Sequence, residues 1–540
     1  MRLALACVLA CVLACAACGG GHTVDGTTRP EAGLVREVFR VLGEAAPPNA
    51  TTGGVTPTAL EATQVARYRV DVDPPAAAHA IIVAYPGFLG GAGTFDGLAR
   101  AMVRQSAETG APVEVWAIDR RANLLEDLTG EDAAEGAGDP ERATRYYFNG
   151  ADEGGQHFSG FKDQADVDYM SEWGFTVHAE DLHRVIALVP KEARRDRVVL
   201  LGHSLGASFA EAYAASRLAD GTHGVDELAG LVLIDGVLGD APISETAYHA
   251  GMPSVTGDSL GLDAIRSTTR YQSLPFFGVE LYARIEILSL RALLHPDALT
   301  VDASRDDFLR LALALGPDAL PKLTDQAVLG FGFDAAFNPF SFARATLGKP
   351  TGGPLASYSS TLSGETLSQP SDPNSRYAWS DDAQSGAITT VAGLAHAFVD
   401  GRTNFAEWYF PARLGLDLAA VGGARVAEGS WQAQAGLRVF DGASIDAPIL
   451  AVAAALVTTD QLTAVRRRVA PAIGAGRVAA GLTRDDPRAF RLVQPAGEAH
   501  LDPVLAGTGP TNHVPADVVD FIGTSVPAGT IAIPRQAPIP

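Results

Sequence analysis

Short runs of consecutive apolar residues, separated by stretches with helical periodicity, constrain the fold of this chain more than any other feature. Examples are Ile81-Ile82-Val83 and Leu231-Val232-Leu233-Ile234. A strand with one solvated face alternates apolar and polar residues, so these runs predict strands covered on both faces, as in a mainly parallel sheet. Because helical patterns lie between the strands, the sequence predicts an α/β architecture.

The predicted strands share this apolar pattern and cover Val65 to Val72, Ala80 to Tyr85, Val113 to Ile118, Val198 to Leu201, Leu228 to Ile234, Pro448 to Val457 and Phe490 to Val493. Roughly 200 residues between the fifth and sixth of them exceed any normal connection. They contain several amphipathic helical patterns and one polar stretch. We therefore predict two parts of one core, residues 58–238 and 446–525, and an inserted, mostly helical cap, residues 239–445. The proline-rich residues 526–540 are predicted to be an unpacked tail.

The amino terminus has the features of an export signal. Met1-Arg2 is followed by an uncharged apolar run to Ala17, which is too short to span a bilayer comfortably. The run ends in small residues before Cys18 and the glycines behind it, and this resembles a bacterial lipoprotein signal. The resemblance implies a signal peptide over residues 1–17 and a lipid on Cys18, with Cys15 as the alternative. An ordinary cleaved secretory signal is the other reading, and both predict export.

Residues 18–57 are rich in Gly, Thr, Pro and Ala, with one helical stretch near Leu34 to Ala45. We predict that they form a flexible tether between the anchor and the folded body.

Charge and cysteine content exclude several classes of function. The chain has 41 Lys and Arg against 63 Asp and Glu, a formal net charge of −22, which opposes binding to nucleic acid or to an anionic lipid surface. All four cysteines lie within the first 18 residues, so the body has no disulfide framework, thiolate zinc cluster or cysteine nucleophile. No phosphate-binding or dinucleotide-binding motif is present, and we expect no cofactor or metal. Membrane contact is expected only through the lipid anchor, and no protein partner is indicated.

One segment has the context of a catalytic serine. Val198 to Leu201 runs directly into Gly202-His203-Ser204-Leu205-Gly206 and then into a helical pattern. In a strand–turn–helix, this motif holds the serine on a strained turn that needs both glycines, and the N–H of Leu205 points where an oxyanion would form. A second copy of the motif, around Ser259, follows no buried strand. We therefore predict Ser204 as the nucleophile.

A glycine-rich loop follows the strand Ala80 to Tyr85. It reads Pro86-Gly87-Phe88-Leu89-Gly90-Gly91 and can fold back over the edge of the sheet. We predict that the backbone N–H of Phe88 is the second oxyanion donor.

Together these residues resemble the α/β-hydrolase superfamily over about 65–240 and 445–525. The resemblance implies a chain order of serine, then Asp or Glu, then a histidine after the last strand. Only His500 and His513 follow Phe490 to Val493, and His500 stands directly after that strand. The resemblance therefore implies that His500 is the base, with His513 as a weaker candidate.

The acid remains open between two main candidates. Asp460 follows the strand that begins at Pro448 and is preferred, although it comes about three residues later than is typical. Asp235, at the end of the preceding strand, is the alternative, and Asp502 and Asp446 are weaker candidates.

The sequence thus predicts an exported serine hydrolase of carboxylic esters, with a bulky or lipid-like acyl group suggested by the size of the cap. The same residues would serve an amide, thioester or polyester hydrolase, and a surface lipoprotein that binds without turnover is the rival. The aromatic segment Phe405 to Phe410 is predicted to anchor the cap, with a wall of an apolar pocket as the alternative.

Overall fold

The computed structural model describes residues 27–251, 260–273, 278–313, 320–382, 384–399, 403, 405–477, 482–505 and 512–536. The predicted signal peptide, Cys15, Cys18 and Ser259 lie outside these residues.

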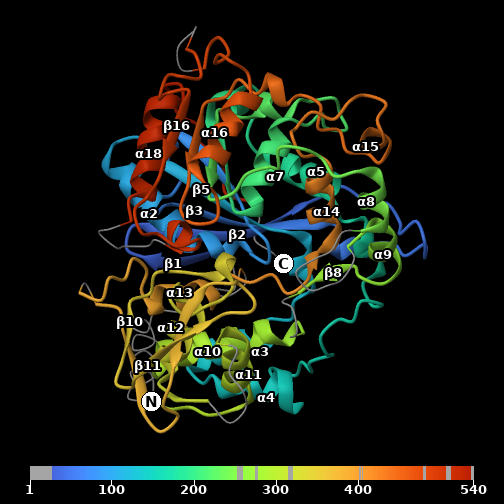
Figure 1. Cartoon of the computed structure of the whole chain (residues 1–540). Helices are drawn as coiled ribbons and strands as arrows, with labels where there is room; N and C mark the ends of the chain where they lie inside the picture. The colour runs from blue at the N-terminus through green and yellow to red at the C-terminus, as the bar shows by residue number, and fades with distance from the viewer. Residues whose placement is uncertain are drawn as a thin grey trace, which may run out of the picture.

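A nine-stranded sheet forms the centre of the molecule (Figure 1). In spatial order its strands are β1 (Thr27–Glu31), β2 (Leu34–Leu42), β3 (Ala62–Val70), β5 (Val113–Asp119), β4 (Ala80–Tyr85), β6 (Val198–His203), β7 (Gly230–Ile234), β15 (Ile449–Val452) and β16 (Phe490–Val493). The strands from β5 to β16 are parallel, whereas β1, β2 and β3 are antiparallel to their neighbours. This strand order is that of the α/β-hydrolase fold, so the predicted fold class is confirmed.

Alternate residues of the central strands enter two separate hydrophobic cores, as the consecutive apolar runs predict. The helices of the core are α2 (Asp96–Glu108), α5 (Phe175–Ile186), α6 (Lys191–Arg197), α7 (Leu205–Ala214), α16 (Thr459–Arg468), α17 (Asp502–Leu505) and α18 (Val514–Ser525). Ile82 and Val232 pack with α2 and α18, whereas Ile81 and Leu231 pack with α5 and α7 on the other face. Both faces of the sheet are therefore buried.

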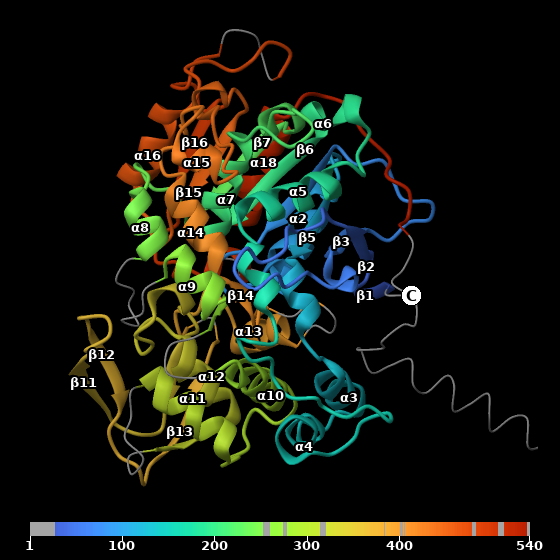
Figure 2. The ribbon, with the colours of Figure 1, turned by 90° about the vertical axis from the view of Figure 1, so that its right-hand side faces the viewer.

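The chain leaves the sheet after β7 and returns at β15, which lies beside β7 in parallel register. Most of the intervening segment forms a cap on one side of the core (Figures 1 and 2). Its elements are α10 (Glu280–Leu294), α11 (Ala303–Leu313), α12 (Asp325–Phe333), α13 (Val391–Phe398) and the short strands β9 (Lys322–Leu323), β10 (Lys349–Thr351), β11 (Leu355–Ser359), β12 (Thr366–Pro370) and β13 (Arg376–Ser380). The other elements of the segment contact one another and residues 168–172 and 412–420: α8 (Glu245–Ala250), α9 (Leu262–Ser267), β8 (Tyr271–Gln272) and β14 (Phe410–Pro411).

The division between core and cap differs from the predicted one at two places. Helices α3 (Thr129–Ala137) and α4 (Glu141–Asn149) come from the predicted core range but pack against α10 of the cap. Helix α14 (Ala412–Ala420) comes from the predicted cap range but packs on α5 and α7 of the core, and the short α15 (Trp431–Gln434) follows it. The cap is thus built from two excursions of the chain, which lie together in Figure 2.

The predicted tether is folded where the structure describes it, and β1 and β2 place its residues 27–42 in the sheet. The stretch predicted to be helical contains β2, whose Leu34 and Phe39 are buried. Two of its charged residues, Arg36 and Glu37, are buried too, and Glu37 pairs with Arg67 and Arg69 of β3. Because these polar residues find partners across the strands, the segment is stable as a strand although its apolar pattern alone is ambiguous.

The predicted unpacked tail is also packed as far as it is described. Ile531 pairs with Ala78, and Ile533 is buried. Arg197 donates hydrogen bonds to the carbonyls of Pro527 and Ala528. Prolines cannot donate to a sheet, but here the carbonyls of the tail accept from buried arginines.

Candidate active site

The predicted nucleophile lies on the sharp turn between β6 and α7. Ser204 has φ 56° and ψ −126°, a conformation that L-residues rarely adopt. A Cβ at Gly202 would lie 2.1 Å from the carbonyl oxygen of Gly206, and a Cβ at Gly206 would lie 2.2 Å from that of Tyr85. The two glycines are therefore required by close backbone contacts, and they force the serine side chain outward.

A third glycine, Gly236, is equally constrained. A Cβ on it would lie 1.9 Å from the carbonyl oxygen of Ser204. The N–H of Ser204 donates to the carbonyl of Ile234 at 2.8 Å, so the end of β7 supports the strained turn from beside it.

His500 and Asp235 meet next to this turn. His500 lies in the loop between β16 and α17, and its Nδ1 is 2.7 Å from Oδ2 of Asp235. Both side chains are almost fully buried. A carboxylate only accepts hydrogen bonds, so Nδ1 carries the proton and Nε2 is left as the acceptor.

Asp235 is surrounded by hydrogen-bond donors. The N–H groups of four successive residues after β15, Ala454 to Val457, donate to its carboxylate at 2.9 to 3.2 Å. Burial alone would raise the pKa of Asp235, but His500 and the amides of Leu456 and Ala455 lower it to about 2. The carboxylate is therefore ionised at neutral pH and fixes the orientation of the His500 ring.

The preference for Asp460 is corrected by this geometry. Asp460 lies exposed in the first turn of α16. The turn that precedes it wraps its amides around Asp235 instead of presenting a carboxylate of its own. Neither weaker candidate bonds His500: Asp502 accepts from Thr346, Thr389 and Ala499, and Asp446 pairs with Arg195 and Arg477. His513 lies exposed ahead of α18.

The two predicted oxyanion amides border the same site. A Cβ on Gly87 would lie 2.9 Å from the Cβ of Ser204, so the loop that carries Phe88 passes directly over the serine. Leu205 is the first residue of α7, where the N–H has no acceptor within the helix. The backbone of Leu205 and the loop that carries Phe88 therefore lie next to Ser204, where the sequence predicts the two oxyanion donors.

His203 is a site residue that the sequence did not single out, although it precedes the serine in the motif. Its Nε2 donates to the carbonyl of His500 at 3.0 Å, and the two ring centroids are 4.4 Å apart. Burial and the neighbouring His500 lower the pKa of His203 to about 3, so it is neutral at physiological pH. His203 therefore ties the His500 loop to the strand that carries Ser204.

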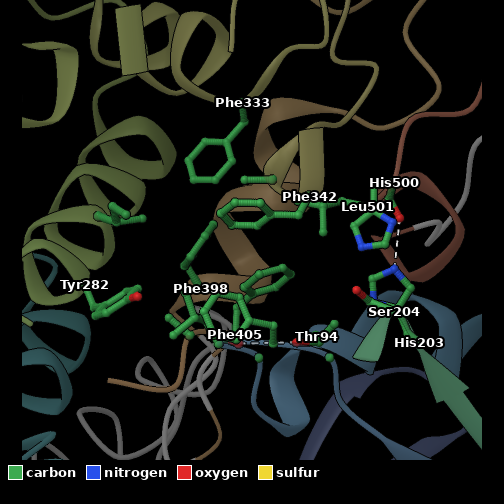
Figure 3. A pocket seen from close by; sticks show the side chains of 17 residues that line it. Thr94, His203, Ser204, Tyr282, Phe333, Phe342, Phe398, Phe405, His500 and Leu501 are labelled. Atoms are coloured by element: carbon green, nitrogen blue, oxygen red, sulfur yellow. Dashed lines mark hydrogen bonds between the residues drawn. The ribbon is translucent and has the colours of Figure 1, made fainter. Parts of the chain in front are cut away.

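An apolar cavity leads from these residues into the cap (Figure 3). Ser204, His203 and His500 lie at one end of it, and aromatic rings from the cap lie at the other. The cap contributes Tyr282, Ile285, Phe333, Phe342, Ala343, Phe398, Phe405 and Ala406. The cavity can therefore accept an apolar group beside the serine.

The aromatic segment Phe405 to Phe410 has both predicted roles. Phe405 lines the cavity, whereas Trp408 and Phe410 are buried between cap and core.

Among the residues that the structure describes, no three His, Cys, Asp or Glu side chains are arranged to hold a metal ion. In the same part of the chain, every helix is too short or too polar to cross a bilayer.

Comparison with known proteins gives structural likenesses only. No family model and no curated protein matches the sequence. Among solved structures, a candidate lipase from Sulfolobus solfataricus is 14% identical, with a TM-score of 0.43 and coverage of 93% of this chain and 96% of that one. A peroxisomal α/β-hydrolase from Saccharomyces cerevisiae is 11% identical, with a TM-score of 0.39 and 94% coverage of each chain. A thermophilic esterase from Thermogutta terrifontis is 11% identical, with a TM-score of 0.32 and coverage of 91% and 100%. The order and direction of its own strands give this chain the α/β-hydrolase fold.

Proposed function

We propose that the protein is a serine hydrolase that cleaves carboxylic esters through Ser204, His500 and Asp235. The observation that carries the proposal is the buried bond from His500 Nδ1 to Asp235, which leaves Nε2 as a base at the end of the cavity where Ser204 sits. A serine hydroxyl is a poor nucleophile at neutral pH unless such a base takes its proton.

In the proposed reaction, Oγ of Ser204 attacks the acyl carbon while His500 Nε2 accepts the hydroxyl proton. The amides of Leu205 and Phe88 stabilise the tetrahedral oxyanion, and each such donor contributes about 3 kcal/mol. His500 then gives its proton to the leaving alcohol as the C–O bond breaks. Water, deprotonated by His500, then attacks the acyl carbon. As the bond from that carbon to Oγ of Ser204 breaks, His500 returns the proton to Oγ, and the acid is released.

We propose that the enzyme prefers esters with a bulky, apolar acyl group. The cavity wall beside Ser204 consists largely of aromatic and aliphatic side chains, most of them supplied by the cap. Because removing such an acyl group from water is favourable by about 0.8 kcal/mol per buried CH2, longer acyl chains should lower KM until the cavity is filled.

Export and a lipid anchor on Cys18, or on Cys15, remain proposals from the sequence. The test is fractionation of cells that express the full chain and its Cys18→Ser and Cys15→Ser variants. Release from the membrane fraction by one variant identifies the anchor, and release by neither contradicts it.

The principal experiment measures release of p-nitrophenol from p-nitrophenyl esters of increasing chain length. Ser204→Ala should lower kcat by about 10⁴-fold or more and abolish covalent labelling by a fluorophosphonate probe. Ser216→Ala is a matched control, because that buried hydroxyl donates to Ala212 in a plain helical contact.

Equal rates for the unaltered protein and Ser204→Ala would contradict the proposal and leave a binding role without turnover. Matched amide and thioester substrates decide whether the ester is the preferred reaction, since the same residues serve all three.

A further inference from the structure

The loop over Ser204 needs external support to hold the Phe88 amide. It runs from Pro86 to Gly91, contains three glycines, and has Leu89 at φ 58°, a backbone conformation that is unfavourable for leucine. A loop of this composition would sample many conformations on its own. An oxyanion donor contributes fully only if it is already aimed at the position of the developing charge.

Arg120, directly after β5, holds this loop from beneath. Its side chain is fully buried. It donates to three carbonyls of the loop: Nη1 to Pro86 at 2.9 Å, and Nη2 to Gly87 and Gly90, each at 2.8 Å. No other side chain in the described residues donates to these three carbonyls.

The bond to Gly87 fixes the direction of the proposed oxyanion donor. The carbonyl of Gly87 and the N–H of Phe88 belong to one peptide group, and that peptide is trans. In a planar trans peptide the C=O and the N–H point in opposite directions. Because Arg120 holds the carbonyl toward itself, the N–H of Phe88 points away from Arg120. Gly87 and Phe88 both line the cavity that Ser204 borders.

Glu407 of the cap-derived segment completes the arrangement. Its carboxylate accepts from Nε of Arg120 at 3.0 and 3.1 Å and from Nη2 at 2.6 Å, and neither side chain is exposed. The backbone of the same segment also bonds the loop: Glu407 N–H donates to Leu89, and Gly91 N–H donates to Phe405. The loop is thus held between the core and the chain returning from the cap.

We propose that Arg120, oriented by Glu407, is a positioning residue that aims the Phe88 amide at the oxyanion and links the cap to catalysis. This inference rests on the proposed ester hydrolysis. It adds that the cap-derived segment supports the transition state as well as lining the substrate cavity.

The first test is Arg120→Lys, which keeps the charge but replaces the planar fork by a single ammonium that cannot bind three carbonyls and both carboxylate oxygens. With p-nitrophenyl esters, kcat should fall about 100-fold while KM changes less than about threefold, as for loss of an oxyanion donor. The affinity for a trifluoromethyl ketone, whose adduct with Ser204 carries the oxyanion, should fall in proportion to kcat/KM.

Arg121→Lys is the matched control. Arg121 is the next residue, is equally buried, and binds both oxygens of Asp181 at 2.6 and 2.9 Å, but it bonds no residue of the loop. Its variant should lose thermal stability with kcat within about threefold of the unaltered protein. A kcat loss in Arg121→Lys as large as in Arg120→Lys, or near-normal kcat in Arg120→Lys, would overturn the inference.

A second pair of variants serves if Arg120→Lys does not fold: Glu407→Gln, and Asp181→Asn as its control. Only Glu407→Gln should lower kcat. Amide hydrogen exchange of the 86–91 peptide gives a readout independent of turnover, and it should accelerate in the Arg120 or Glu407 variant alone. If the unaltered protein neither turns over nor labels, the proposed function fails, and this exchange by itself decides whether Arg120 holds the loop.

Discussion

Two sites in this molecule hold buried carboxyl side chains whose pKa values are shifted in opposite directions. Asp235 lies at the edge of the core sheet among backbone amides and next to His500. Glu131 of α3 and Glu286 of α10 lie in the interior of the cap beside each other and near Glu126. Asp235, Glu131 and Glu286 are all buried, so burial by itself does not explain the difference.

The pKa directions follow from the neighbours. Donors lower the pKa of Asp235 to about 2 against the effect of burial. Burial raises the pKa of Glu286 to about 8, and Glu126 adds to the rise, while burial and Glu286 raise the pKa of Glu131 well above its usual range. At neutral pH Asp235 is therefore ionised, whereas Glu131 and Glu286 hold protons.

The hydrogen bonds around Tyr147 support the protonated state of Glu131. The Tyr147 hydroxyl oxygen lies 2.6 Å from the carbonyl of Asp127 and 2.6 Å from Oε2 of Glu131. One hydroxyl has one proton, and the carbonyl can only accept it. A protonated Glu131 that donates to Tyr147 satisfies both contacts. The comparison shows that available donors, more than depth, decide whether a buried acid is charged.

The largest expected effect tests the ionised site. Asp235→Asn should lower kcat/KM for p-nitrophenyl esters by about 10⁴-fold, because an amide does not stabilise the imidazolium or hold the correct ring tautomer. Asp460→Asn is the matched control and should change the rate less than about twofold, since Asp460 is exposed. The reverse result would remove Asp235 from the catalytic set.

The second prediction tests the protonated site through the pH dependence of stability. A carboxyl group whose pKa is raised by folding stabilises the protein below its unfolded pKa, and this contribution is lost as the pH rises through the folded value. Wild type should therefore lose stability relative to Glu286→Gln between pH 5 and pH 8, by about 3 kcal/mol.

Calorimetry of both proteins across this pH range measures the difference between their free energies of unfolding. Because both proteins contain the same buried histidines, the contributions of the histidines cancel in this difference. Asp235 contributes no slope here, because its lowered pKa makes its stabilisation disappear only below about pH 4. If the two free energies of unfolding differ by the same amount at every pH, the prediction that Glu286 is protonated at neutral pH is wrong.

The smallest effect sharpens the same comparison. Tyr147→Phe removes the hydroxyl between Asp127 and Glu131, and it should lower the free energy of unfolding at pH 6 by about 1 kcal/mol. Phe148→Leu, in the same helix and partly exposed, is a control for loss of aromatic packing. Chemical denaturation measures both, and a Tyr147 variant as stable as wild type would argue against the shared proton.

Much of the core was predictable because its signals are local. The strand, two glycines and helix around Ser204 lie within about fifteen consecutive residues, and each local choice favours the same turn. Consecutive apolar residues such as Ile81 and Ile82 likewise indicate a strand buried on both faces, which the two hydrophobic cores confirm. His500 could be predicted from the sequence because it follows the last strand.

Only the tertiary structure decided between Asp235 and Asp460. Asp235 and Asp460 follow the neighbouring parallel strands β7 and β15. The segments that contain them therefore start at the same, carboxyl-terminal end of the strands. The choice depends on which way each turn bends: one carries Asp235 toward His500, and the other contributes amides that hold it. No local sequence pattern indicates which of the two turns carries the carboxylate and which supplies the amides.

The same reason explains the remaining differences. The segment Leu34–Leu42 becomes a strand because Arg67 and Arg69, about thirty residues away, neutralise its Glu37. Arg120 acquires a role because Glu407 returns from the cap. Helix α3 packs on α10 although this contact buries Glu131 beside Glu286. By itself the sequence determined the strained serine turn and the parallel sheet, which are properties of short segments. Partners across hundreds of residues depend on packing, and the folded chain alone selects them.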